Sequence, residues 1–263
     1  MNLDVIKKRL ESLNKVSTST SSNDGKSIFW KPSVGKQTIR VVPSKFNKEF
    51  PFTEMMFYYE IGSKTIPSPA NWKEKDPIME FTKQLRQSSD RENWRLAKKL
   101  DPKVRIFAPV IVRGEESEGV KLWQFGKETY QEFLNMATDE EVGDFTDVYE
   151  GRDIKLNTVG PEATGTKYNK TSVSPSLKSS PLVDNDSDVE RFLNDQVNPL
   201  EVFKKYSFEE IKQMLQEWLS PEDSNENEEE EESLGSASKS NYSLNVSKKT
   251  NEDKFNDLFD DED

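Results

Sequence analysis

The chain has 263 residues and a net charge of -12, with 37 basic and 49 acidic side chains and neither cysteine nor histidine. The lack of Cys and His excludes disulfides, zinc fingers and Ser-His or Cys-His catalysis, and we expect no metal and no cofactor. No apolar run approaches the roughly 18 residues that span a membrane, and no signal peptide opens the chain, so we expect a soluble intracellular protein with no membrane partner.

Residues 1–25 are predicted to form an N-terminal arm. Residues 2–14 have the apolar spacing of a short amphipathic helix, and its basic patch is Lys7, Lys8 and Arg9. A polar run follows and separates this helix from the body. The apolar stripe either packs on its own core or docks on a neighbouring copy, and the polar linker favours the second.

A body of mixed elements is predicted for residues 26–220. Period-two patterns indicate strands at 37–43, 53–61, 104–112, 120–125 and 153–159. Helices are predicted after Asp76-Pro77, from Ser89, over 127–137, from Ser187 and from Ser207. The sequence therefore predicts an α+β protein, and the acidic stretch 221–263 is predicted to be disordered.

Two neighbouring strands alternate cations and rings on one face. Lys121, Trp123 and Phe125 share a face, with Lys127 just beyond. In the strand before it, Arg105 and Phe107 share a face in the same way. Bases of single-stranded nucleic acid stack on such rings while cations follow the phosphates. An ordinary half-buried sheet with snorkelling Lys and Arg is the alternative, and the repetition in both strands favours binding.

The helix after Ser89 carries a second basic stripe. Arg91, Trp94, Arg95 and Lys98 follow at i, i+3, i+4 and i+7. A basic stripe is usually a solvated face, but an exposed Trp within it indicates a binding partner. Tyr168, between Lys167 and Lys170 in a glycine-containing loop, is a weaker candidate for contact with a bound strand.

The tail has three apolar residues among seven acids. Phe255, Leu258 and Phe259 fall at i, i+3 and i+4, a small helical face. This face either docks into grooves of partner proteins or enters the protein's own basic cleft. An inert, solvating acidic tail is the remaining alternative.

Charge and rings are unevenly distributed along these elements. Residues 26–130 have a net charge of +7 and hold 15 of the 27 aromatic residues. Residues 131–219 have a net charge of -9, and residues 220–263 one of -11. This polarity favours a single-stranded DNA-binding body with an acidic tail. The alternatives are a scaffolding protein that does not bind nucleic acid and a magnesium-dependent nuclease that uses Asp184, Asp186 and Asp188.

Three short stretches resemble the single-stranded DNA-binding (helix-destabilising) proteins of T-even-type bacteriophages. These are Ile39-Arg40-Val41-Val42-Pro43-Ser44, the run Glu118 to Lys127, and Ser207-Phe208-Glu209-Glu210-Ile211. The resemblance implies an OB-fold-like barrel with an inserted helical subdomain at about 62–103 and helical closure at about 183–220. It also implies cooperative coating of DNA through the arm in the infected host's cytoplasm, and recruitment of replication and recombination proteins by the tail. DNA-contacting positions implied by the resemblance are Arg40, Trp94, Lys98, Lys99, Lys121, Trp123, Phe125, Lys127 and Tyr168.

The sequence departs from this family at one point. Relatives of the T-even type hold zinc in the inserted subdomain with Cys and His, which this chain lacks. The corresponding stretch must be held by apolar packing instead. Trp72, Ile78, Phe81 and Leu85 are the candidates.

Overall fold

The structure, a computed structural model, describes residues 27–61, 64–219, 255 and 259. The chain forms two compact units, and each combines stretches that are distant in sequence. Unit 1 comprises Met1–Met55 and Val104–Lys204, and unit 2 comprises Met56–Lys103 and Lys205–Asp263. No helix within the described ranges has the length and apolar character needed to cross a membrane.

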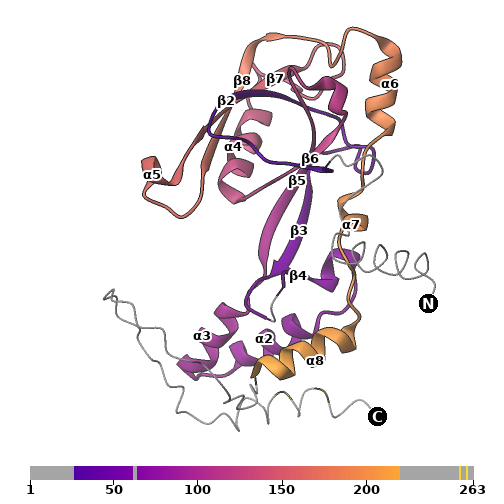
Figure 1. The fold of residues 1–263 in the computed structure, drawn as a ribbon. Helices are drawn as coiled ribbons and strands as arrows, with labels where there is room; N and C mark the ends of the chain where they lie inside the picture. The colour runs from indigo at the N-terminus through magenta and orange to yellow at the C-terminus, as the bar shows by residue number, and fades with distance from the viewer. Residues whose placement is uncertain (1–26, 62–63, 220–254, 256–258, 260–263) are drawn as a thin grey trace, which may run out of the picture. The chain divides into compact units, whose positions relative to one another are not determined.

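Unit 1 is built on a sheet of strand order β1-β6-β5-β2-β7-β8 (Figure 1). Neighbouring strands are antiparallel except β1 and β6, which are parallel. Along this path β1 and β8 lie at opposite ends, so the sheet is not closed into a barrel; the predicted α+β class is confirmed. The strands are β1 (Phe29–Trp30), β2 (Gly35–Val41), β5 (Lys103–Val112), β6 (Lys121–Phe125), β7 (Arg152–Val159) and β8 (Lys170–Ser179).

Apolar residues cover both faces of this sheet. On one face Val110 of β5 and Trp123 of β6 pack with Phe133 of α4 (Lys127–Ala137). On the other face Ile111 of β5 packs with Phe192 of α6 (Asp186–Asn194). The expectation that one face of β5 and β6 meets solvent is therefore wrong. The described residues of unit 1 also form the shorter helices η2 (Glu116–Glu118), α5 (Pro161–Thr164) and α7 (Pro199–Val202).

Unit 2 is mainly helical. Its elements are β3 (Thr53–Tyr58), which begins in unit 1, β4 (Ile66–Pro67), η1 (Pro69–Trp72), α2 (Pro77–Gln87), α3 (Arg91–Lys99) and α8 (Phe208–Leu219). Helix α2 packs against both α3 and α8 (Figure 1). The apolar cluster between them contains the predicted residues Ile78, Phe81 and Leu85. Trp72 is half-buried and lies outside this cluster.

A buried carboxylate ties the start of α2 to the rest of unit 2. Asp76, only 4% exposed, accepts hydrogen bonds from the backbone N–H of Ile78 (2.9 Å) and Met79 (3.2 Å). Its other oxygen accepts from the Tyr58 hydroxyl (2.8 Å) and from Ser68 Oγ. Burial, reinforced by the Asp76 charge, raises the pKa of Tyr58, which keeps this donor protonated. Buried polar groups with partners and an apolar cluster thus organise unit 2.

Most predicted boundaries agree with the structure, and the differences have local causes. Ser207 and Glu210 form the predicted reciprocal capping box of α8. Helix α3 is capped by Asp90 rather than Ser89, and α6 by Asn185 rather than Ser187, because these carboxylate and amide oxygens accept from N2. The strand predicted for 53–61 ends at residue 58.

Strand β8 was not predicted. Val173, Pro175 and Leu177 alternate with polar residues, but the serines and Pro175 are poor strand formers, and none of the ten residues is buried. This weak pattern becomes a strand through its pairing with β7 from Lys170 to Ser179, a tertiary contact that the local sequence does not specify.

Candidate nucleic-acid interface

The basic stripe on α3 is exposed, as the helical spacing predicts. Arg91, Trp94, Arg95 and Lys98 all face solvent, while Ala97 packs inward. Trp94 is 51% exposed, and Lys98 Nζ lies 5.4 Å from the centre of its ring. This pair places an exposed ring beside a cation, the combination that binds single-stranded nucleic acid.

Other residues of unit 2 extend the same chemistry. Lys99 is exposed, and its Nζ lies 5.1 Å from the centre of the Trp218 ring. Tyr59 is 40% exposed at the end of β3. Arg95 forms an ion pair with Glu92 at 2.6 Å, so part of its charge is compensated. Lys98 and Lys99 are therefore the stronger candidates for phosphate contact.

Unit 1 carries a separate exposed ring in the loop between α5 and β8. Tyr168 is 79% exposed, and the Thr166 hydroxyl donates to its carbonyl oxygen at 2.8 Å. Lys170 forms an exposed ion pair with Glu128 at 3.3 Å. Lys127, the first residue of α4, is exposed. These residues offer a ring and cations to solvent, as predicted.

The rings on β5 and β6 are buried, so the prediction that they are exposed is wrong. Trp123 is 2% exposed, Phe125 is 7% exposed and Phe107 is fully buried. The ring centres of Trp123 and Phe125 lie 4.7 Å apart within the core, and the Trp30 ring packs edge-on against that of Trp123. The alternation does place Trp123 and Phe125 on one face of β6, and that face points into the core. Bases cannot stack on these rings in this conformation.

Arg40 is also buried, contrary to the solvent-facing position that the resemblance implies. Its Nη2 donates to the carbonyl oxygens of Asp147 (2.7 Å) and Ser180 (2.8 Å), and its Nη1 lies 3.5 Å from Asp153. Burial lowers the pKa of Arg40, and Asp153 opposes this effect. The guanidinium holds three segments of the chain together and is not accessible to a DNA phosphate.

Two further cations on the strands are partly engaged. Lys121 Nζ donates to the carbonyl oxygen of Ser27 at 2.9 Å and pairs with Glu118 at 3.5 Å, and its side chain is 12% exposed. Arg105 is half-buried and has interactions of its own. Neither presents the open cation that the strand pattern suggests.

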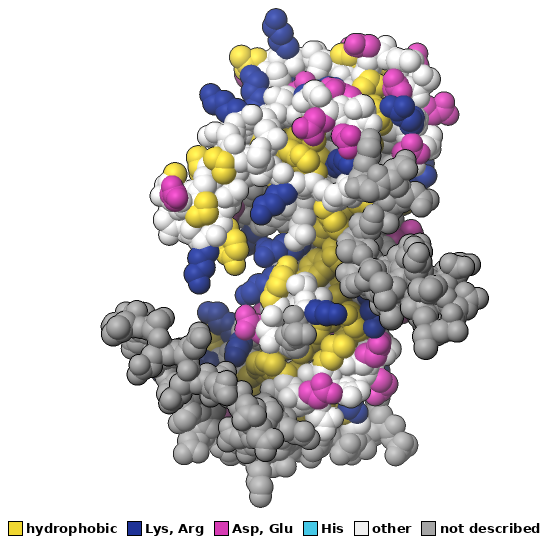
Figure 2. Space-filling model, in the orientation of Figure 1, with side chains coloured by type: hydrophobic (Ala, Val, Ile, Leu, Met, Phe, Trp, Pro, Cys, Tyr) yellow, Lys and Arg dark blue, Asp and Glu magenta, His cyan; other side chains and the backbone are white. Residues whose placement is uncertain are grey.

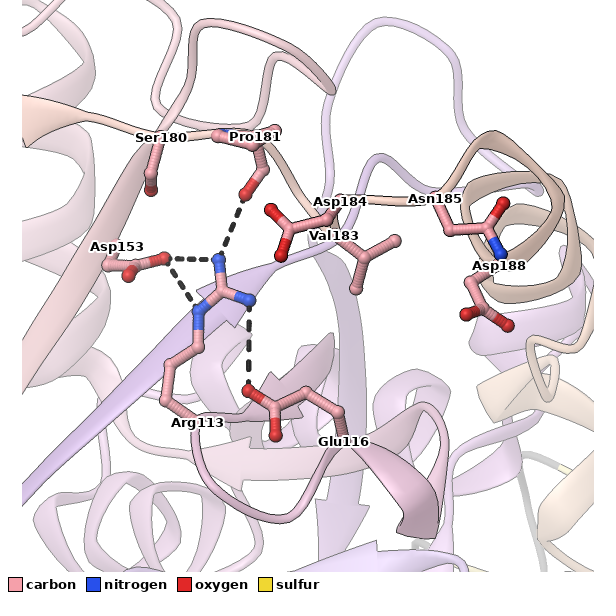
Figure 3. Close-up of a pocket in the computed structure, with 9 residues that line it drawn as sticks. All are labelled: Arg113, Glu116, Asp153, Ser180, Pro181, Val183, Asp184, Asn185 and Asp188. Carbon is pink, nitrogen blue, oxygen red and sulfur yellow. Dashed lines mark hydrogen bonds and ion pairs between the residues drawn. The ribbon is translucent and has the colours of Figure 1, made fainter.

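A cavity of about 480 Å³ beside α6 has the wrong charge for DNA. Arg113 lies in it but is paired with Asp153 at 2.7 Å, and it also contacts Glu116 and the carbonyl oxygen of Pro181 (Figure 3). Asp184 and Asp188 add two more carboxylates to the lining. Acidic side chains also gather over the edge of unit 1 that carries α6 (Figure 2). The lining thus contains four carboxylates, those of Glu116, Asp153, Asp184 and Asp188, and such a concentration of negative charge repels phosphate.

The described residues offer no acidic cluster that would support the nuclease alternative. Within the described residues, no group of three or more acids has the arrangement to hold a metal ion. The whole chain lacks Cys and His, so the donor set of the family's zinc does not fit this sequence.

One exposed ring was missed. Phe46 is 45% exposed in the loop after β2, between the exposed residues Lys45 and Lys48. Lys45 Nζ donates to the Asn194 carbonyl oxygen at 3.0 Å, which holds this loop on unit 1. A ring between two lysines in a polar stretch was the available signal, and it was overlooked because no strand or helix pattern contains it.

The remaining predicted residues divide into two groups. Lys7, Lys8, Arg9 and Leu258 lie outside the described residues. Phe255 and Phe259 are described, and both pack on the apolar cluster of unit 2.

Comparisons with known proteins agree with this chemistry. The protein-family model described as "gp32 DNA binding protein like" matches residues 33–220, more than half of the chain. A search of curated proteins finds no match.

Proposed function

The chain belongs to the gp32-like family of DNA-binding proteins, a non-catalytic family, and from this premise we propose that it coats single-stranded DNA without sequence preference. The observation that carries the proposal is Trp94, half exposed with Lys98 over its ring on a basic helix. A base stacks on the indole while Lys98 and Lys99 meet the phosphates. Tyr168 and Lys127 of unit 1 offer further contacts of the same kind.

A salt-dependent titration tests this proposal. About six phosphate contacts with single-stranded DNA predict a slope of log K against log salt of roughly -4. Trp fluorescence should be quenched by poly(dT), and duplex DNA should bind much more weakly because its bases are already stacked. Absence of binding to either form of DNA would favour the scaffolding alternative. In that alternative the acidic residues 131–263 bind partner proteins, and the basic residues 26–130 have a structural role alone.

We further propose that the arm, residues 1–25, makes binding cooperative by docking on the neighbouring protomer through its apolar stripe and its patch of Lys7, Lys8 and Arg9. Deleting residues 1–16 should reduce clustering on long DNA far more than it reduces affinity for a single-site oligonucleotide. The measurement compares the two substrates for both proteins. Undiminished clustering after the deletion would contradict the proposal.

The acidic tail has a separate role in the proposed function. We propose that the acidic tail recruits replication, recombination and repair proteins in the cytoplasm of the infected host cell. Loss of their binding when residues 221–263 are removed is the test.

We also propose an OB-like core, which the mainly antiparallel strand path of unit 1 supports. A DNA-bound structure in which the two edges of the sheet stay apart would contradict it.

A further inference from the structure

The two tail rings lie against the helices of unit 2. Phe255 is 2% exposed and belongs to the same apolar cluster as residues of α2 and α8. Its ring centre lies 5.9 Å from that of Phe81 on α2 and 4.9 Å from that of Phe259. Phe259 is half-buried, and its ring centre lies 5.7 Å from that of Phe208 on α8. The pair thus bridges the two helices.

Lys212 of α8 contacts the outer ring in two ways. Its Nζ lies 4.8 Å from the centre of the Phe259 ring, and it donates to the carbonyl oxygen of the same residue at 3.5 Å. A cation over the ring and a hydrogen bond to the backbone of the same residue both favour this position of Phe259. The site on α8 therefore binds Phe259 through polar as well as apolar contacts.

The contact joins two parts of the chain that are not neighbours in sequence. Residues 220–254, a stretch of 35, separate Leu219 at the end of α8 from Phe255. A tethered segment of this kind behaves as a ligand at high effective concentration, because its docking is intramolecular. Release of its two rings would leave the chain path through α8 unchanged.

We propose that α2 and α8 form a receptor groove whose reversible occupant is the chain's own segment with Phe255 and Phe259. Because two rings make the contacts, docking is mainly apolar and resists salt, unlike the binding of DNA. A partner protein that recognises the same rings competes with the groove, so self-docking withholds the tail until such a partner is present. The groove itself does not depend on DNA binding.

A labelled peptide of residues 250–263 probes the groove in the full-length protein. In the F255D/F259D variant the groove is vacant, and the peptide should bind at least about tenfold more tightly than to the unaltered protein, whose own tail occupies the site. A peptide carrying F255D/F259D should not bind. Raising NaCl from about 0.1 to 0.5 M should change the peptide's Kd by less than about threefold, because ionic screening acts on charges and not on ring burial.

A charge variant separates rings from acids. The matched control, D257N/D260N/D261N, keeps both rings and removes three charges. It should admit the peptide no better than the unaltered protein does. Equal peptide binding by all three proteins would overturn the proposal. So would a groove that opens only in the charge variant, because electrostatic attraction would then hold the tail.

Hydrogen exchange covers the case in which the double variant unfolds unit 2. Phe259 is the outer, half-buried ring, so F259A removes its contacts and leaves Phe255 in the cluster. Amides of α8 should exchange faster in F259A, and excess unaltered peptide should restore their protection. Unchanged exchange would contradict docking. Protection that rises with protein concentration would instead assign the groove's occupant to a second copy.

Discussion

Replacing Arg40 with leucine should lower the free energy of unfolding by about 2–5 kcal/mol, because two partly buried carbonyl oxygens are left without a donor. The carbonyl oxygens of Asp147 and Ser180 lose their donor. Asp153 keeps Arg113 at 2.7 Å, so its charge is not left alone. The lost carbonyl partners and the void therefore dominate the effect. Urea denaturation followed by circular dichroism measures it.

The matched control is K36L, since Lys36 is an exposed residue of the same strand. Its effect on stability should stay within about 0.5 kcal/mol. Where R40L is still folded, its affinity for single-stranded DNA should equal that of the unaltered protein. A variant of normal stability with weakened DNA binding would restore Arg40 as a DNA contact and refute the structural role.

Gly151 belongs to the same buried arrangement. A Cβ at this position would collide with Arg40 Nη2 and with the Asp147 carbonyl oxygen. The glycine is present because the guanidinium and two backbone segments converge where no side chain fits.

Replacing Trp94 with alanine should weaken binding of single-stranded DNA by about 5- to 150-fold, the equivalent of about 1–3 kcal/mol for one stacked base. The indole is 51% exposed, so the loss is one of stacking and not of core packing. Most of the fluorescence quenching by poly(dT) should disappear in the same variant. Trp123 is buried, and the other three Trp residues are only half-buried.

Two variants sharpen this second measurement. W94F keeps an aromatic face and should recover most of the affinity. Y149A removes a ring that is 66% exposed but is flanked by Asp147 and Glu150 on the acidic half of unit 1, and it should leave binding unchanged. Equal losses for W94A and Y149A, or none for W94A, would show that the α3 stripe does not stack bases.

The sequence was sufficient for features set by local spacing. The α3 stripe is exposed where the i, i+3, i+4, i+7 pattern placed it, because one helical turn decides which residues share a face. In a strand, period two separates two faces but does not say which of them is covered. Trp123 and Phe125 share a face as predicted, and the core cluster with Phe133 covers it. That choice depends on tertiary packing.

Arg40 and Phe255 show the same limit from opposite directions. A cation in a strand and a ring in an acidic tail are both ordinarily exposed by composition. Arg40 is buried because carbonyl oxygens and Asp153 from distant segments converge on it. Phe255 is buried because α2 and α8 leave room for a ring. Neither partner set is adjacent in sequence.

The split construction of unit 2 sets the time at which this unit can be completed during synthesis. Residues 56–103 leave the ribosome long before α8, and Phe255 follows Lys103 by 152 residues. At 5–20 residues per second, that interval is about 8–30 s. Until α8 and then Phe255 are made, Ile78, Phe81 and Leu85 lack part of the apolar cluster that later buries them. A nascent chain of this protein therefore exposes an apolar surface for seconds, long enough for chaperones to bind it.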